Sequence, residues 1–311
     1  MENTEISEQV NTARYIRPKF ARFNFFDCFN IFFFVILCVI MVYPFWSVLM
    51  TSFIYPHEYM NRIIILWPRN WAMISYQYIF ATDRFTRSFA VTLFVTVVGT
   101  LYQLILTSTC AYALTKKTLP GYKFFVGMIT LTMFFGGGVI PYYMLIRSLG
   151  LMNTVWVLIL GTFGVFNFII MRAFMDQIPK ELEESATIDG ANELRIFFTL
   201  ILPLSKAVLA VITLWVAVGF WNAYFNAMIF LPTRVDLHPL QLILRRMIVE
   251  VGGAAGGADL RYRQLFGEDA IIFEDGIKMA AVIVATAPIL VVYPFLQKYF
   301  VKGIYLGSLK G

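Results

Sequence analysis

The segment Glu181–Lys206 reads ELEESATIDGANELRIFFTLILPLSK, with a charged first half, one glycine in the middle and a proline near its end. It lies between two stretches, 148–171 and 207–233, that contain no Asp, Glu, Lys or Arg. A charged side chain in the hydrocarbon core of a bilayer is costly. This pattern therefore predicts a loop outside the membrane that joins two membrane-spanning segments.

Six uncharged stretches of this kind, each 19 to 30 residues long, occur along the 311-residue chain. A helix needs about 20 apolar residues to cross a bilayer. Only 14% of the residues are charged, against about 25% in soluble domains. We therefore predict an all-α membrane protein with six transmembrane helices. The predicted spans are about 29–52, 88–114, 124–146, 153–172, 207–230 and 279–298.

Six spans place both termini on one side of the membrane. This side, which includes the loop 176–206, would carry 14 of the 25 Lys and Arg residues. The positive-inside rule then predicts a cytoplasmic tail 1–27, a spanning domain 28–300 and a cytoplasmic tail 301–311. The glycine-containing loop 231–277 would lie outside, either contacting an external protein or forming an uninvolved insertion.

The opening segment has the spacing of two short helices joined by a turn. Ile178, Leu182 and Ala186 recur every four residues, and Gly190 follows where a left-handed residue costs least. A second apolar face then follows at helical spacing, and Pro203 ends or kinks that helix. The second face consists of Leu194, Phe197, Phe198 and Ile201.

The charge of this segment favours a protein partner over a lipid surface. Six acids and four bases lie from Arg172 to Lys206. Helices that lie on a cytoplasmic leaflet favour Lys and Arg on their polar face, because that leaflet is anionic. A basic groove on another protein suits the segment better, although a helix lying on lipid remains the alternative.

The segment also resembles the "EAA" loop of permease subunits of bacterial ATP-binding cassette (ABC) importers. The pattern E-x-A-x3-G-x9-hydrophobic-x-L-P begins at Glu184 and ends at Pro203, with Ser185 and Leu200 as mild departures. The stretches IPYYMLIRSLGLMNTVWVLIL, FWNAYFNAMIFL and QKYFVKGIYLGSLKG resemble the maltose-type, carbohydrate-importing branch. The stretch MFFGGGVIPYYM resembles its LplC-like subgroup.

This resemblance implies a coupling helix that docks on a cytoplasmic ATPase. It implies four kinds of partner: a second permease, two ATPase subunits that bind ATP and Mg, an extracytoplasmic solute-binding protein, and a carbohydrate substrate. It also implies a location in the bacterial cell membrane. The coupling residues would be Glu181, Glu184, Ser185, Ala186, Asp189, Gly190, Leu202 and Pro203.

The sequence contains no motif that would give this chain a catalytic activity of its own. The sequence lacks the G-x-x-x-x-G-K-[ST] pattern that cradles ATP phosphates. Its two histidines are far apart, and its three cysteines lack metal-ligand spacing. We therefore expect a transport subunit that is not an enzyme and that binds no cofactor or metal.

The fifth predicted span carries the clearest polar stripe, along one face of LWVAVGFWNAYFNAMIF. Amides in hydrocarbon are expensive unless they meet a partner. The stripe therefore predicts either hydrogen bonds between helices or a sugar path, in which aromatic rings and amides contact the substrate. The candidate path residues are Asn222, Trp221, Tyr224, Asn226 and, in the fourth span, Asn167.

Three consecutive glycines, Gly136, Gly137 and Gly138, fall in the middle of the third predicted span. They permit either close packing of helices or a broken helix that lines a cavity, and either arrangement suits a gate. Pro141 can kink the same helix.

These features favour the permease subunit of a carbohydrate importer. A permease for another solute remains an alternative. A secondary transporter or channel would need ionisable residues within its spans, and the six stretches have no Asp, Glu, Lys or Arg. In a membrane scaffold or receptor, the polar stripe would serve only to pack helices together.

Overall fold

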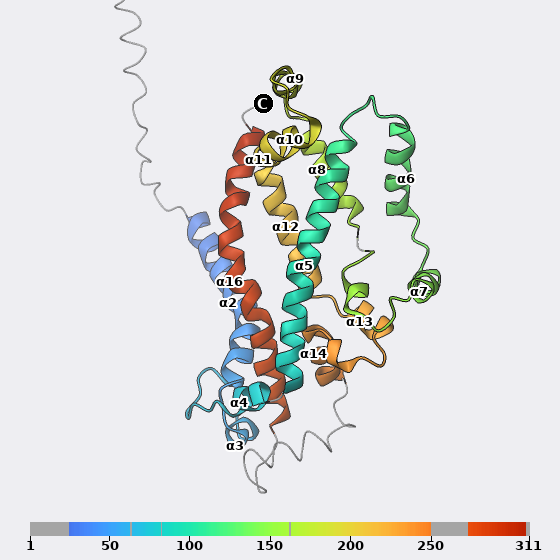
Figure 1. Cartoon of the computed structure of the whole chain (residues 1–311). Coiled ribbons are helices and arrows are strands. Elements are labelled where there is room, and N and C mark those ends of the chain that lie inside the picture. The colour runs from blue at the N-terminus through green and yellow to red at the C-terminus, as the bar shows by residue number, and fades with distance from the viewer. Residues whose placement is uncertain (1–24, 63, 82, 162, 250–272, 309–311) are drawn as a thin grey trace, which may run out of the picture. The chain divides into compact units, whose positions relative to one another are not determined.

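The computed structural model describes residues 25–62, 64–81, 83–161, 163–249 and 273–308 (Figure 1). Every regular element in these ranges is a helix. The chain falls into two compact units, Met1–Val48 and Leu49–Gly311. The first unit contains most of α2 (Phe25–Thr51), and the second contains all later elements.

Three continuous helices are long and apolar enough to cross a membrane. They are α2, α5 (Asp83–Ala113) and the first part of α16 (Glu274–Ser308). They correspond to the predicted spans 29–52, 88–114 and 279–298. The predictions of an all-helical protein and of these three helices are confirmed.

The other three predicted spans are interrupted in the structure, so single spanning helices are not confirmed there. The region 124–146 forms α6 (Tyr122–Phe134) and α7 (Val139–Ser148), which meet at 120°. The region 153–172 forms the 3-10 turn η1 (Val155–Leu158) and the short helix α8 (Val165–Met175). The region 207–230 forms α12 (Lys206–Trp221) and α13 (Phe225–Phe230).

The triple glycine produces the first of these breaks. Gly138 has φ +79° and ψ 174°, a backbone conformation essentially confined to glycine. Within this chain the glycines do not serve close packing, because a Cβ atom on Gly136 or Gly138 would meet nothing within 4 Å. Pro141 lies in the first turn of α7, where its missing N–H group has no helical acceptor to lose, so it does not kink the helix.

Helix α5 is the centre of the second unit. It packs against α8 and α12, and α12 also packs against α16 (Figure 1). Glycine permits the approach of α5 to α12, because a Cβ atom on Gly99 would lie 2.7 Å from the ring of Phe220. The core between these helices includes Phe168 and Ile212, both fully buried.

Two groups of short elements lie at opposite ends of this unit (Figure 1). One end carries α9 (Lys180–Ile188), α10 (Glu193–Ile196), the π-helical η2 (Phe197–Ile201) and α11 (Leu202–Leu204). The other carries α3 (Pro56–Met60), α4 (Ile74–Ala81), α13, η3 (Val235–Leu237) and α14 (Leu240–Val249). Helix α14 lies within the predicted loop 231–277, and it packs against α5 and α16.

The break between α6 and α7 yields a first prediction. Gly138→Ala places a side chain in a conformation that costs roughly 1–3 kcal/mol for residues other than glycine. We expect the variant to unfold at a lower temperature than the wild type in detergent. Gly136→Ala is the matched control, since Gly136 has open space and no left-handed φ. Equal melting temperatures for the two variants would show that Gly138 does not determine the break.

Candidate functional site: a charged elbow and a discontinuous path

The predicted helix–turn–helix is present, and we call residues 180–204 the elbow. Gly190 ends α9 with φ +81°. Its N–H donates to the Thr187 carbonyl at 3.0 Å, and the N–H of Ala191 donates to the Ala186 carbonyl at 2.9 Å. These two bonds form a Schellman motif, which explains the glycine at this position. The Asn192 side chain then caps α10 by accepting from the Arg195 N–H.

The second half of the elbow is one helical run from 193 to 204 that widens to a π-helix at 197–201. Pro203 does not end this run, which continues to Leu204. The chain then bends by 81° at Ser205, between the elbow and α12. The expected change of direction is therefore present, two residues after the proline.

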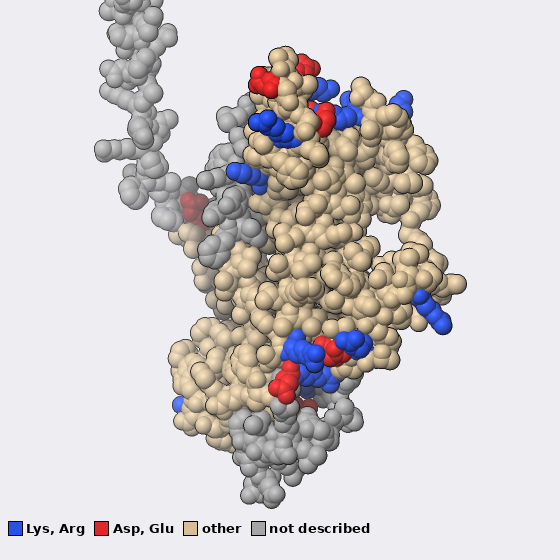
Figure 2. Space-filling view, viewed as in Figure 1, with Lys and Arg blue, Asp and Glu red and all other residues tan. Residues whose placement is uncertain are grey.

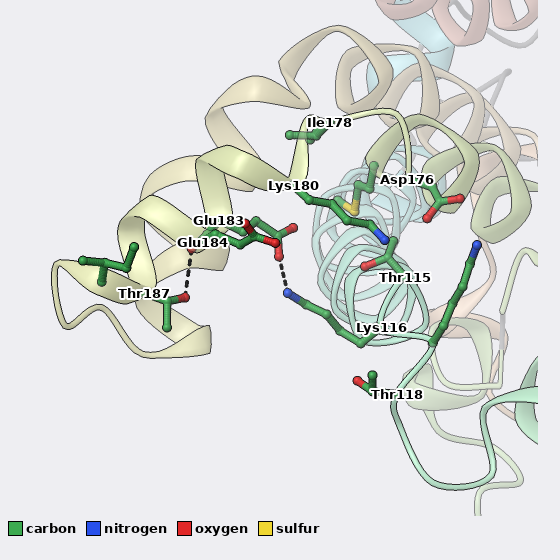
Figure 3. Close-up of a pocket in the computed structure, with 12 residues that line it drawn as sticks. Thr115, Lys116, Thr118, Asp176, Ile178, Lys180, Glu183, Glu184 and Thr187 are labelled. Atoms are coloured by element: carbon green, nitrogen blue, oxygen red, sulfur yellow. Dashed lines mark hydrogen bonds and ion pairs between the residues drawn. The ribbon is translucent and has the colours of Figure 1, made fainter.

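A cluster of charges fastens the elbow to the end of α5. The Lys116 ammonium contacts the Glu183 carboxylate of α9, as Figure 3 shows. It also lies 3.3 Å from the Glu193 carboxylate of α10, which accepts a 2.6 Å hydrogen bond from the Tyr112 hydroxyl. One lysine thus holds both helices of the elbow.

These contacts favour the charged forms of Lys116 and Glu193. Burial opposes the charge of Lys116, but Glu183 and Tyr112 outweigh burial and raise its pKa. The Tyr112 hydrogen bond, followed by the charge of Lys116, lowers the pKa of Glu193. The carboxylate's contribution to stability is therefore present at neutral pH and is lost as pH falls through this lowered pKa.

The predicted coupling residues divide into two faces. Ala186 and Leu202 pack against the core of their own chain. The other six are exposed: Glu181, Glu184, Ser185, Asp189, Gly190 and Pro203. Beside them Ile188 is 87% exposed, and a hollow of about 420 Å³ lies between α9 and residues 115–118, which follow α5 (Figure 3). The elbow thus presents an apolar tip with acids around it.

The predicted polar stripe does not follow one helix. Helix α12 ends at Trp221, Asn222 forms its C-cap, and α13 begins three residues later. At this end of α12 the Asn222 side-chain amide donates to the Val218 carbonyl at 3.0 Å, and the backbone N–H of Asn222 donates to the same carbonyl at 3.1 Å. The prediction of a continuous stripe is therefore wrong.

Trp221 faces the protein interior. Its side chain is 5% exposed, and its indole N–H donates to the Ala285 carbonyl of α16 at 2.9 Å. This hydrogen bond links α12 to α16 directly before the break. Within this chain Trp221 anchors α12 to α16, and its expected role along a sugar path stays a prediction.

Two other candidate path residues, which lie at the break between α12 and α13, line two cavities. Tyr224 lines a cavity of about 390 Å³ with α14 and α16. Asn226 lines another, of about 500 Å³, together with Gly137, Gly138 and Pro141. The predicted gate and part of the predicted path therefore meet at one cavity. Roles in transport stay predictions for all of these residues.

Asn167 lies apart in sequence, in α8, and is half-buried. A Cβ atom on Gly164 would lie 2.7 Å from the amide nitrogens of both Asn167 and Gln103. These amides therefore share one space between α8 and α5, and Gln103 is a polar residue that the sequence did not single out.

Sequence reasoning also missed Lys116, Gln241 and Arg245. Gln241 and Arg245 belong to α14, within a region predicted to be loop. The helix was detectable, because Leu240, Leu244 and Met247 recur at i, i+4 and i+7 and form one packed cluster. No local signal marks Lys116, whose partners lie 67 and 77 residues along the chain.

Comparison with known proteins identifies the class. No model of a protein family matches. The protein LplC of Bacillus subtilis (strain 168) is 41% identical over 287 residues, which cover 92% of this chain and 95% of LplC. The polygalacturonan/rhamnogalacturonan transport system permease protein YtcP, from the same organism, is 40% identical, with 92% and 98% covered.

A solved bacterial ABC transporter, involved in the import of the acidic polysaccharide alginate, has a similar chain. The TM-score is 0.81 with 31% sequence identity, and the match covers 88% of this chain and 96% of that chain. The protein described here belongs to the family of ABC transporter permeases and is a multi-pass membrane protein. Within that family its similarity is to the permeases of sugar-importing systems.

The cluster at the elbow yields a second prediction. Lys116→Gln removes the charge shared by Glu183 and Glu193, so we expect faster hydrogen exchange across residues 180–196. Lys117→Gln is the control, because the exposed Lys117 lines the same hollow and makes no ion pair among the described residues. Identical exchange in both variants would remove the fastening role of Lys116.

Proposed function

We propose that this chain forms part of the translocation path of a carbohydrate importer and couples that path to cytoplasmic ATPases through residues 181–203. One observation carries the proposal: the elbow presents an exposed apolar tip among acids while Lys116 holds it to α5. An exposed apolar patch rimmed by polar residues is typical of a protein interface.

The exposed residues suit an ATPase cleft. Ile188 would enter an apolar pocket, and Glu184 would pair with a basic residue at its edge. A charge-assisted hydrogen bond of this kind contributes about 1.5–3 kcal/mol. Ala186 faces its own chain, so in this proposal it supports the elbow rather than touching the partner.

The complete importer would contain a second permease, two ATPase subunits and an extracytoplasmic solute-binding protein. ATP and Mg would be bound by the ATPases, and this chain would hydrolyse nothing. The elbow and both termini would lie in the cytoplasm, with six membrane crossings that include the broken segments. The end that carries α13 and α14 would then face the binding protein.

The path would run along the helix breaks. The cavities beside Tyr224 and Asn226 lie where α12 and α6 are interrupted. Non-helical backbone at membrane depth is tolerated only inside protein or beside water, which is the environment of a hydrophilic solute. A secondary transporter is disfavoured, because the long apolar segments lack charges that could couple to an ion.

The docking role of the elbow yields a third prediction. Glu184→Lys reverses the exposed charge, so we expect less ATPase to be recovered with the affinity-purified permease. Glu274→Lys is the control, since Glu274 is also exposed and lies at the start of α16, at the other end of the unit. Equal recovery of ATPase with the two variants would refute the proposed contact.

Transport itself gives a fourth prediction. Reconstituted vesicles that contain the complete importer should take up a carbohydrate only with both ATP and the solute-binding protein. Gly190→Val should insert normally and yet reduce this uptake several-fold, because a β-branched residue resists the left-handed turn. Uptake without ATP would overturn the proposed function, and full uptake by the variant would overturn the coupling role of the turn.

A further inference from the structure

The cavity beside Tyr224 is lined by an arginine, Arg245, to which the transport proposal assigns no role. Its volume is about 390 Å³, within the range of small-molecule sites. Helix α14 contributes Gln241 and Arg245, and α16 contributes Val282, Ala285 and Thr286. The cavity therefore combines a cation, an amide and an aromatic ring with an apolar wall.

Arg245 has no carboxylate partner in the part of the chain that the structure describes. Its guanidinium lies 5.2 Å from the centre of the Tyr224 ring and donates to the Met228 sulfur at 3.0 Å. A thioether is a weak acceptor. The side chain is exposed, so most of its five donors remain available to a ligand.

Two other cations at this end of the unit are already paired. Arg234 binds Asp236 through two 2.8 Å hydrogen bonds, and Lys278 lies 3.5 Å from Glu274. Figure 2 shows this end as a group of basic and acidic side chains on an otherwise uncharged surface. Arg245 differs from these cations because its neighbours are an aromatic ring and a sulfur atom.

The surrounding groups match a sugar that carries a carboxylate. An arginine binds a carboxylate through two parallel hydrogen bonds, a geometry that a neutral hydroxyl cannot supply. The Gln241 amide donates to the Asn222 carbonyl oxygen at 3.2 Å. The remaining amide groups of both residues can donate to and accept from ring hydroxyls.

We propose that Arg245, with Tyr224, Gln241 and Asn222, forms a subsite for the carboxylate of a uronic acid residue in the transported oligosaccharide. The subsite lies at the end of the unit opposite the elbow (Figure 1), so it receives the substrate at the mouth of the path. Tyr224 positions the guanidinium, and the two amides select the sugar ring. This inference rests on the proposed function and specifies its substrate class.

The test measures uptake by the complete importer in vesicles, with ATP inside and its binding protein outside. The probes are trigalacturonate and its fully methyl-esterified form, which has the same length without charge. Direct binding of both probes to the purified importer is measured in parallel, so that the result does not depend on the binding protein. Arg245→Gln should weaken uptake and binding of trigalacturonate by at least about ten-fold and leave the ester unchanged.

Two further variants control for charge and for folding. Arg245→Lys keeps the charge without the paired donors and should recover part of the lost binding. Arg246→Gln removes the adjacent arginine, which does not line the cavity, and should leave both probes unaffected. If Arg245→Gln fails to assemble, Arg245→Lys alone must still weaken trigalacturonate more than the ester.

The outcomes separate the two proposals. Unchanged trigalacturonate uptake by Arg245→Gln, equal losses for both probes, or wild-type preference for the ester would overturn the subsite and leave the importer function intact. Failure of the wild-type importer to take up any carbohydrate with ATP and binding protein would overturn the proposed function itself.

Discussion

A backbone inside a bilayer must find hydrogen-bond partners within the protein or in water. The long helices α2, α5 and α16 meet this requirement over most of their length, apart from the positions before Pro44 in α2 and before Pro288 and Pro294 in α16, but the segments at 135–138 and 222–224 do not, because regular helix ends there. Each break adjoins a cavity, of about 500 Å³ at Gly137 and Gly138 and about 390 Å³ at Tyr224. The same constraint that disfavours a break in lipid therefore concentrates breaks, polar side chains and space for water in one region of the molecule.

The elbow is held at both of its ends by different means. Its second helix runs into α12 through the bend at Ser205, while Lys116 ties α9 and α10 to the end of α5. Helices α5 and α12 also pack directly on each other, with Gly99 against Phe220. A displacement of the elbow would therefore move both α5 and α12. The exposed Ile188 is the part of the elbow that is accessible to a partner.

Local rules predicted what depends on local chemistry. Uncharged stretches located α2, α5 and α16, and the glycine spacing located the turn at Gly190. The breaks were harder to predict because LWVAVGFWNAYFNAMIF contains no proline, and an asparagine can bond within a helix as well as end it. Lys116 and Arg245 owe their positions to packing between segments distant in sequence, and no pattern within a single segment encodes that. The position of Trp221 shows the same limit, since its burial depends on α16.

In the proposed topology, in which α12 crosses the bilayer, the bend of 81° between the run 193–204 and α12 would have a consequence for hydrophobic mismatch. Helices that meet at nearly a right angle transmit an axial shift of one as a lateral shift of the other. A lateral shift leaves every apolar residue of α12 at its original depth between the headgroup layers. Hydrophobic mismatch costs a fraction of a kcal/mol for each ångström of vertical displacement. The bend thus allows α12 to move across the plane of the bilayer without that penalty.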